Sequence, residues 1–115
     1  MADCLFCRIV AGEIPAAIVK RSDEALGFRD IDAKAPVHFL VIPTKHVAAV
    51  RDAKGADGER LLGRLLAFAA EIAAEQGLDR DGYRIVTNTG RNAGQSVDHL
   101  HLHVLGGRKL TWPPG

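Results

Sequence analysis

Apolar residues recur along this chain with two different periods, and the period of each segment predicts its secondary structure. Short β-rich segments bounded by turn residues predict five strands, over residues 15–21, 24–30, 36–42, 83–88 and 97–105. The first two flank a Ser22-Asp23 turn. The third, PVHFLVI, is almost continuously apolar, so we expect a central strand that is covered on both faces and whose pairing ends at Pro43.

One long amphipathic helix is predicted over residues 58–76, where apolar residues recur at steps of three and four. Asp57 is expected to cap its start and Gly77 its end. A short helix is expected within residues 45–52. These elements predict an α+β fold with a five-stranded, mostly antiparallel sheet. Because the chain has 115 residues and shows no linker or repeat, we expect a single domain, residues 1–115.

The net charge and the hydropathy of the chain bear on whether it binds nucleic acid or associates with a membrane. Fifteen basic and 14 acidic residues give a net charge of +1, which gives no support for a nucleic-acid partner or an anionic membrane surface. No apolar run approaches the roughly 18–20 residues that cross a bilayer, and the N-terminus has no secretory signal pattern. We therefore expect a cytoplasmic protein whose two cysteines, Cys4 and Cys7, are reduced.

Three histidines alternate with apolar residues in the last predicted strand. Side chains along a strand alternate between its faces, so His99, His101 and His103 are expected on one face, about 6.5–7 Å apart along the chain. Imidazoles are costly to bury and contribute little to packing. The alternative is an incidental, solvated polar face. The functional interpretation is favoured because the preceding segment is also rich in polar groups.

That preceding segment, residues 89–96 (TGRNAGQS), is a glycine-rich loop. Glycines let backbone N–H groups approach a phosphate closely, and Gln95 and Ser96 add side-chain donors. A glycine-rich loop alone is more often only a turn. Followed by three aligned histidines, it predicts a nucleophile or base beside an anion pocket. His38 and His46 flank the apolar third strand, so both can join this site if the two strands are neighbours.

Four segments together resemble the histidine triad (HIT) superfamily: GQSVDHLHLHVLGGR, DCLFCRIVAGEIPA, FRDIDAKAPVHFLVIPTKH and LTWPPG. The resemblance covers nearly the whole chain. It is closest to the Hint branch, the purine nucleoside phosphoramidases. It implies a homodimer in which two five-stranded sheets join into a ten-stranded sheet, with the C-terminal tail reaching the partner's site. Asp98 departs from the aromatic residue of close eukaryotic relatives.

The resemblance assigns catalytic roles to His101, His103, His38 and Ser96. His101 matches the nucleophile that forms a nucleotidyl-histidine intermediate, and His103 matches the residue that contacts the phosphate. His38 matches a histidine of the surrounding hydrogen-bond network, and Ser96 a residue suited to assist the leaving amine. The implied nucleotide-binding residues are Phe6, Ile9, Phe28, Asp30, Ile31, Leu40, Asn88, Gly94, Gln95, Ser96, His101, His103 and Trp112.

Several nucleotide-site assignments have a plain structural alternative. Without the resemblance, Phe28, Ile31 and Leu40 would be interpreted as core residues. Asp30 fits a turn or a cap as well as it fits a ribose contact. Trp112 fits an ordinary anchor for a loose tail.

The cysteine pair forms a C-x-x-C motif, which is compatible with redox chemistry, zinc or chance. Redox motifs follow a strand and open a helix in a βαβ unit, which the extreme N-terminus does not offer. Zinc requires further ligands, and His46 and His99 can supply them. The pattern of Cys4, Cys7, His46 and His99 is similar to that of bacterial superfamily members and the galactose-1-phosphate uridylyltransferase branch. It implies a structural zinc, with no cofactor required for the chemistry.

The sequence thus predicts a hydrolase of purine nucleoside 5′-phosphoramidates that releases an AMP- or GMP-type nucleotide, with no nucleic-acid or membrane partner. One alternative is hydrolysis of dinucleoside polyphosphates, against which the Trp-Pro-Pro tail and the position of Ser96 argue. Nucleotidyl transfer uses the same intermediate with a different acceptor. A nucleotide- or zinc-binding interaction protein with little turnover belongs to another class, and in it His101→Ala would leave the biological function intact.

Overall fold

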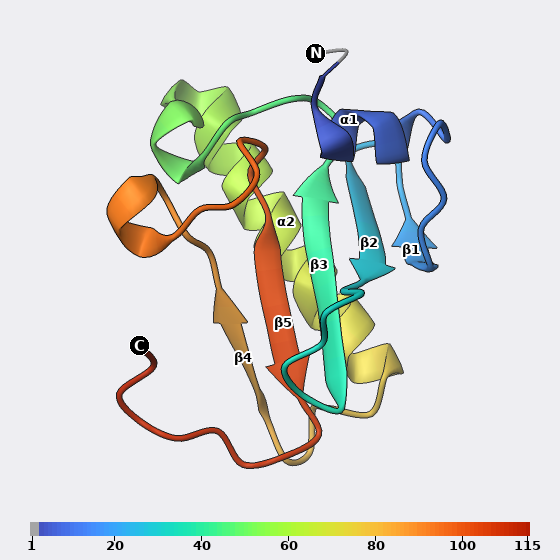
Figure 1. The fold of residues 1–115 in the computed structure, drawn as a ribbon, viewed down its shortest axis with the longest axis vertical. Coiled ribbons are helices and arrows are strands. Elements are labelled where there is room, and N and C mark those ends of the chain that lie inside the picture. Colours follow the sequence, from blue (N-terminus) through green and yellow to red (C-terminus); the bar gives the residue numbers. More distant parts are fainter. Residues whose placement is uncertain (1–2) are drawn as a thin grey trace.

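A computed structural model describes residues 3–115, which fold around one five-stranded sheet (Figure 1). The strands lie in the order β1-β2-β3-β5-β4, and every neighbouring pair is antiparallel. Their bounds are Ile18–Arg21 (β1), Ala25–Arg29 (β2), Val37–Pro43 (β3), Tyr83–Val86 (β4) and Leu102–Gly106 (β5). The predicted α+β fold and the central position of the third strand are confirmed. Within the described range, no helix combines the length and apolar character needed to cross a membrane.

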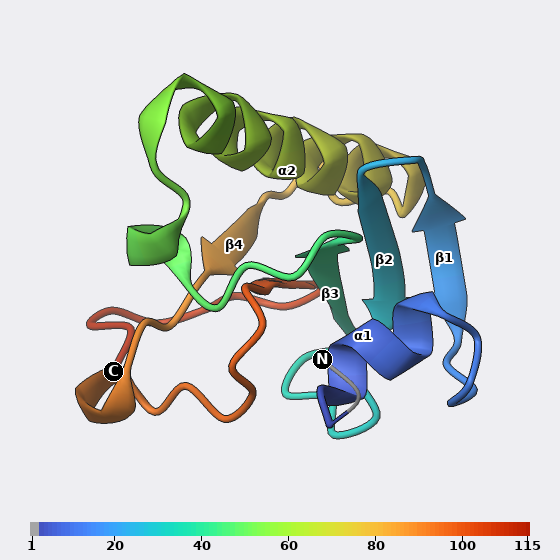
Figure 2. The same cartoon turned by 90° about the horizontal axis from the view of Figure 1, so that it is seen from above.

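Two helices cover opposite faces of the sheet (Figure 2). The long helix α2, Gly55–Glu75, packs Leu65, Phe68 and Ile72 against one face. The short helix α1, Leu5–Val10, packs Phe6 and Ile9 against the other. Since strand side chains alternate, β3 contributes Phe39 and Val41 to one core and Leu40 and Ile42 to the other, and this explains its nearly continuous apolar run.

The helix boundaries differ from the prediction at the start. Helix α2 begins at Gly55 with Lys54 in the capping position, so the prediction that Asp57 caps it is wrong. Asp57 lies in the first turn instead, where a carboxylate still interacts favourably with the helix dipole. Gly77 follows the helix with a φ of 76°, as expected for a glycine that ends one. The short helix expected within 45–52 is limited to one 3₁₀ turn, Val50–Asp52.

The last strand begins five residues later than predicted, at Leu102 rather than residue 97. Residues 97–99 form a bend, and the N–H of Leu100 donates to the carbonyl of Val47 instead of to a neighbouring strand. His99 and His101 therefore precede the regular strand, and His103 lies within it. A second 3₁₀ turn, Arg91–Ala93, lies in the glycine-rich loop.

Candidate functional site

His101 lies immediately before β5 and is 3% exposed. Its Nδ1 is 2.7 Å from the carbonyl oxygen of His99. A carbonyl can only accept, so Nδ1 carries a hydrogen, and in the neutral ring Nε2 is the nitrogen with the lone pair. The ring forms part of the wall of a cavity of about 280 Å³. An imidazole with one nitrogen oriented by a backbone acceptor and the other unprotonated is suited to act as a nucleophile or base.

The tautomer of His103 is fixed through a chain of hydrogen bonds that begins at the backbone. The N–H of Lys34 donates to His38 Nδ1 at 3.0 Å, so a neutral His38 ring carries its hydrogen on Nε2. That Nε2–H donates to His103 Nδ1, also at 3.0 Å. His103 consequently carries its hydrogen on Nε2, where it can donate to a ligand. Oδ2 of Asp30 lies 3.3 Å from His38 Nε2 and 3.8 Å from His103 Nδ1.

The protein environment favours the neutral form of both imidazole rings in this hydrogen-bond chain, His38 and His103. Burial is the main cause that lowers the pKa of His38, and the nearby Asp30 opposes it. Burial also lowers the pKa of His103 to about 4, assisted by the electrostatic influence of the neighbouring His101 and His38 imidazoles and opposed by Asp30. A neutral His103 donates a hydrogen bond to an anion without the desolvation cost of a buried charge.

An apolar slot opens beside these histidines. Its walls include Phe6, Ile9, Phe28, Ile31 and Leu40, and Asp30, Ser96, His101 and His103 also line it. Phe6 and Phe28 meet edge to face with their ring centres 5.5 Å apart. Phe28 and Leu40 are buried, as a core interpretation also requires, but Ile31 is fully exposed at 104%, so the core interpretation is wrong for Ile31. The slot accommodates a flat apolar ring whose polar substituents reach the carboxylate and the imidazoles.

The side chain of Gln95 is occupied within the protein. Its Oε1 accepts from the N–H of Gly90, and its Nε2 donates to the carbonyls of Ala48 and Val97. All these bonds hold the glycine-rich loop against neighbouring backbone. Gln95 therefore shapes the loop, and its amide is not directed at a ligand as the sequence had led us to expect.

Ser96 is the loop residue best placed to contact a ligand. It is exposed and lines the apolar slot, a second cavity shared with Asn88 and His103, and a third beside the cysteines. Gly94 ends the 3₁₀ turn with a φ of 78°, a backbone conformation that only glycine adopts easily. Trp112 is 80% exposed and lies over Arg84, away from the residues that line the slot of this chain.

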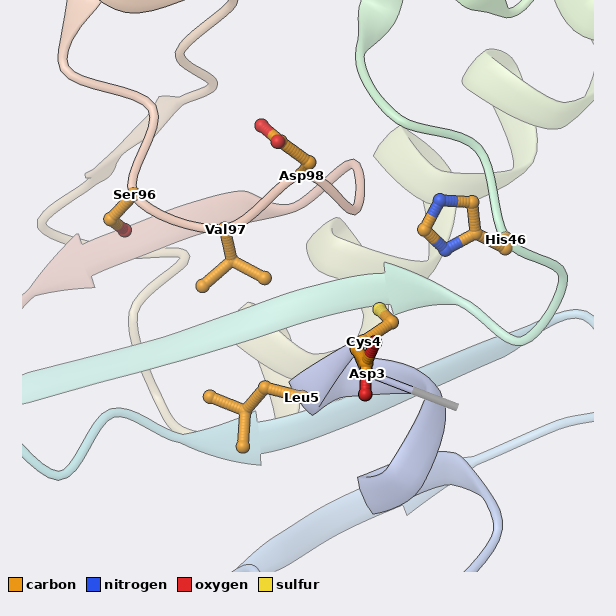
Figure 3. A pocket seen from close by; sticks show the side chains of 7 residues that line it. All are labelled: Asp3, Cys4, Leu5, His46, Ser96, Val97 and Asp98. Carbon is orange, nitrogen blue, oxygen red and sulfur yellow. The ribbon is translucent and has the colours of Figure 1, made fainter. Parts of the chain in front are cut away.

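Two cysteines and two histidines converge at the start of α1. Cys4 Sγ lies 3.3 Å from His99 Nδ1, and Cys7 Sγ lies 3.3 Å from His46 Nδ1 and 3.5 Å from His99 Nδ1. The four ligand atoms all lie within 4.8 Å of one another. Figure 3 shows Cys4 and His46 at one end of the adjoining cavity, with Ser96, Val97 and Asp98 along its other side. Asp98 lies in the bend before β5 and lines this cavity.

The chemistry of this cluster fits a zinc ion. In a tetrahedral site with bonds of about 2.3 Å to sulfur and about 2.0 Å to nitrogen, the two kinds of ligand atom lie about 3.5 Å apart. The Nε2–H of His99 donates to the carbonyl of Pro43 at 2.9 Å, which leaves Nδ1 unprotonated toward the thiols. Burial and the neighbouring Cys4 raise the pKa of Cys7, so a bound dication would be needed to hold the Cys7 sulfur as a thiolate near neutral pH.

Sequence reasoning missed the backbone groups that set the tautomers. The N–H of Lys34 and the carbonyl of His99 give no signal in residue type, because every residue offers the same backbone groups. It also missed α1 as a helix, although the spacing of Phe6 and Ile9 is compatible with one face of a helix.

Comparison with known proteins gives a consistent assignment. The sequence profile of the HIT domain matches residues 11–110. An uncharacterized HIT-like protein of Synechococcus elongatus is 51% identical over 113 residues, which are 98% of this chain and 97% of the relative. A HIT family hydrolase from Legionella pneumophila is similar in structure, with a TM-score of 0.94 and 49% identity over 98% of this chain and 100% of the other. A histidine triad nucleotide-binding protein from Candida albicans has a TM-score of 0.82 and 30% identity over 98% of this chain and 85% of the other.

Proposed function

This chain belongs to the HIT domain family, and we propose that it hydrolyses purine nucleoside 5′-phosphoramidates with His101 as the nucleophile. The observation that carries the proposal is the hydrogen bond from His101 Nδ1 to the carbonyl of His99. It leaves an unprotonated Nε2 in the wall of the cavity, beside a neutral donor, His103.

In the first step, Nε2 of His101 attacks the phosphorus atom. A phosphorus–nitrogen bond to His101 forms, and the bond to the leaving amine breaks. The hydroxyl of Ser96 lies at the junction of the three cavities and assists proton transfer to the departing nitrogen. In the second step, water attacks phosphorus, a phosphorus–oxygen bond forms and the bond to Nε2 of His101 breaks. The nucleoside monophosphate leaves, and the proton released by the water replaces the one that the leaving amine took up. Covalent catalysis divides one difficult displacement into two easier ones.

His103 and His38 stabilise the charge that develops on the phosphate oxygens. The Nε2–H of His103 donates to an oxygen of the phosphorus group, and the hydrogen-bond chain through His38 to the N–H of Lys34 holds this tautomer in place. Asp30 balances partial positive charge on either ring. Because these donors are already oriented before substrate binds, little reorganisation is needed during the reaction.

The nucleoside occupies the apolar slot, with its base between the walls formed by Phe6, Ile9, Phe28, Ile31 and Leu40. The carboxylate of Asp30 lines both this slot and the neighbouring cavity, so it can accept hydrogen bonds from the ribose hydroxyls. Asn88, Gly94 and the backbone of Gln95 contribute to the phosphate side of the site.

A homodimer completes the site in this proposal. Strand β4 forms one edge of the sheet, and its backbone is available to a second copy. Leu66 on α2 is 50% exposed, and Trp112 in the tail is 80% exposed. Pairing of two sheets would bury these groups and bring Trp112 of one copy toward the slot of the other.

Zinc is the proposed occupant of the cluster formed by Cys4, Cys7, His46 and His99. Four protein ligands leave no open coordination position, so the ion would stabilise the fold and make no direct contact with the reacting groups. Native mass spectrometry should give a dimer that carries two zinc ions. An apo-dimer isolated from metal-replete cells would refute this assignment.

The test of the reaction is incubation with adenosine 5′-phosphoramidate, measuring AMP release and the intact protein mass after a base quench. We expect AMP release by the wild type, loss of release in His101→Ala, and partial rescue of His101→Gly by added imidazole. Turnover that persists in His101→Ala would eliminate His101 as the nucleophile. AMP binding without turnover in the wild type would favour an interaction protein instead.

A further inference from the structure

The short helix α1 contributes residues to both sites. Cys4 lies at its N-terminal cap and Cys7 one turn later, and both belong to the cysteine–histidine cluster. Phe6 lies between them in the sequence and points into the other site, where it lines the apolar slot. A displacement of this helix must therefore change the metal cluster and the slot together.

Phe6 makes direct contact with the nucleophile. Its ring centre lies 5.2 Å from that of His101, with the two planes at 87°. It also meets His99 edge to face at 5.9 Å. The ring centre of His103 lies 5.1 Å from that of His101. The hydrogen bond to the His99 carbonyl fixes one atom of the His101 ring, and the contacts with Phe6 and His103 restrict rotation about that bond.

His99 provides a second connection between the sites. Its Nδ1 faces both thiols, its Nε2–H donates to Pro43, and its carbonyl accepts from His101. One residue thus contributes its ring to the cluster and its backbone to the orientation of the nucleophile. Movement of the His99 ring would shift the acceptor on which the His101 tautomer depends.

The cysteine–histidine cluster lies beside an open cavity. Cys4, Cys7 and His46 are half-buried, and a cavity lined by Cys4, Leu5 and His46 opens beside them (Figure 3). Helix α1 has six residues, too few to be stable on its own. It is held by the packing of Phe6 and Ile9 and by the contacts of the two cysteines. An ion bound by all four side chains would add bonds that tie the cysteines of the helix to His46 and His99, and its loss would loosen the helix.

We propose that metal occupancy of the cysteine–histidine cluster controls the alignment of His101, and that Phe6 is the positioning residue that transmits it. The inference rests on the proposed role of His101 and the proposed zinc. A small misplacement of a reacting group lowers the rate of the chemical step strongly, whereas nucleotide binding depends on many other contacts. Metal removal should therefore reduce kcat much more than it raises KM.

The experiment compares the full-length wild type, zinc-loaded and after removal of zinc by a chelator, with circular dichroism to verify that the fold is retained. Turnover of adenosine 5′-phosphoramidate gives kcat and KM. NMR of ¹⁵N-labelled imidazoles reports the Nδ1–H of His101 in both forms. We expect zinc removal to lower kcat about tenfold or more and to shift or broaden the His101 signal.

Three variants at two positions of this helix separate positioning from general stability. Phe6→Leu retains apolar volume but removes the ring contact, so its kcat should be low with zinc and change less than about twofold on zinc removal. Val10→Ala removes a half-buried contact of α1 that does not line the slot, and its kcat should respond to zinc as the wild type does. Phe6→Tyr retains the ring and should restore most of the response.

The inference is overturned if zinc removal leaves kcat and the His101 signal unchanged, or if Phe6→Leu responds to zinc like the wild type. Absence of AMP release in every preparation would refute the proposed reaction instead. In that case the His101 signal still decides the coupling, because it is measured without turnover.

Discussion

Replacement of His103 with glutamine should remove much of the acid sensitivity of this fold. The native environment lowers the pKa of His103 to about 4, chiefly by burial and then by the electrostatic influence of the neighbouring His101 and His38 imidazoles. In the unfolded chain the same group titrates near its ordinary value of about 6.5. Between these values the unfolded chain binds a proton that the native protein does not, so the free energy of unfolding decreases as the pH falls.

The size of this effect follows from the two pKa values. The contribution of His103 is complete above about pH 6.5 and is lost progressively toward about pH 4. From about pH 7.5 to about pH 5, linkage gives a loss of at most about 2 kcal/mol in the free energy of unfolding. The side chain is 22% exposed, and contact with water keeps the loss below that bound.

Urea denaturation of the wild type and His103→Gln at these two pH values measures the difference. Glutamine is neutral throughout and can still accept a hydrogen bond from His38. Both proteins retain the cysteine–histidine cluster, so acid release of a metal contributes equally to each. The wild type should lose between about 1 and 2 kcal/mol more than the variant. Equal losses would refute the view that the fold holds His103 neutral.

Replacement of two glycines of α2 with alanine should change stability in opposite directions. A Cβ on Gly58 would lie 2.2 Å from the backbone carbonyl carbon of Ala53, so Gly58→Ala should destabilise the protein by about 1–3 kcal/mol. A Cβ on Gly63 would meet nothing within 4 Å, so Gly63→Ala should stabilise the protein by about 0.5–1 kcal/mol. Thermal denaturation of both variants measures this, and a stabilising Gly58→Ala would contradict the close approach. Ser96→Ala should slow hydrolysis at least about tenfold for alkylamine leaving groups and less for anilines, which leave with less need of a proton. Rates measured across a series of leaving groups test this, and an equal loss for all of them would argue against assistance by Ser96.

The sequence by itself determined the main elements and the chemical groups of the site. The alternation of His101 and His103 with Leu102 and Val104 reflects a strand with one face toward α2 and the other toward the slot. The three- and four-residue spacing of apolar positions gave α2, because only one face of that helix is buried. These signals are local, so residue type and spacing are sufficient to predict them.

Short or non-local features depended on the tertiary structure. Helix α1 is too short to give a clear periodic signal, and its stability comes from packing on the sheet. Strand β5 starts late because the N–H of Leu100 donates a hydrogen bond to the carbonyl of Val47, a residue distant in sequence. Pairing of β3 with both β2 and β5 brings Asp30, which follows β2, together with His38 and His103.

The protonation pattern of the site also belongs to the tertiary structure. The sequence indicates that His101 and His103 are present, but not which ring nitrogen carries the hydrogen. The carbonyl of His99 decides this for His101, and the N–H of Lys34, acting through His38, decides it for His103. Because backbone groups are the same in every residue, only their positions in the folded chain decide which nitrogen of each ring carries the hydrogen.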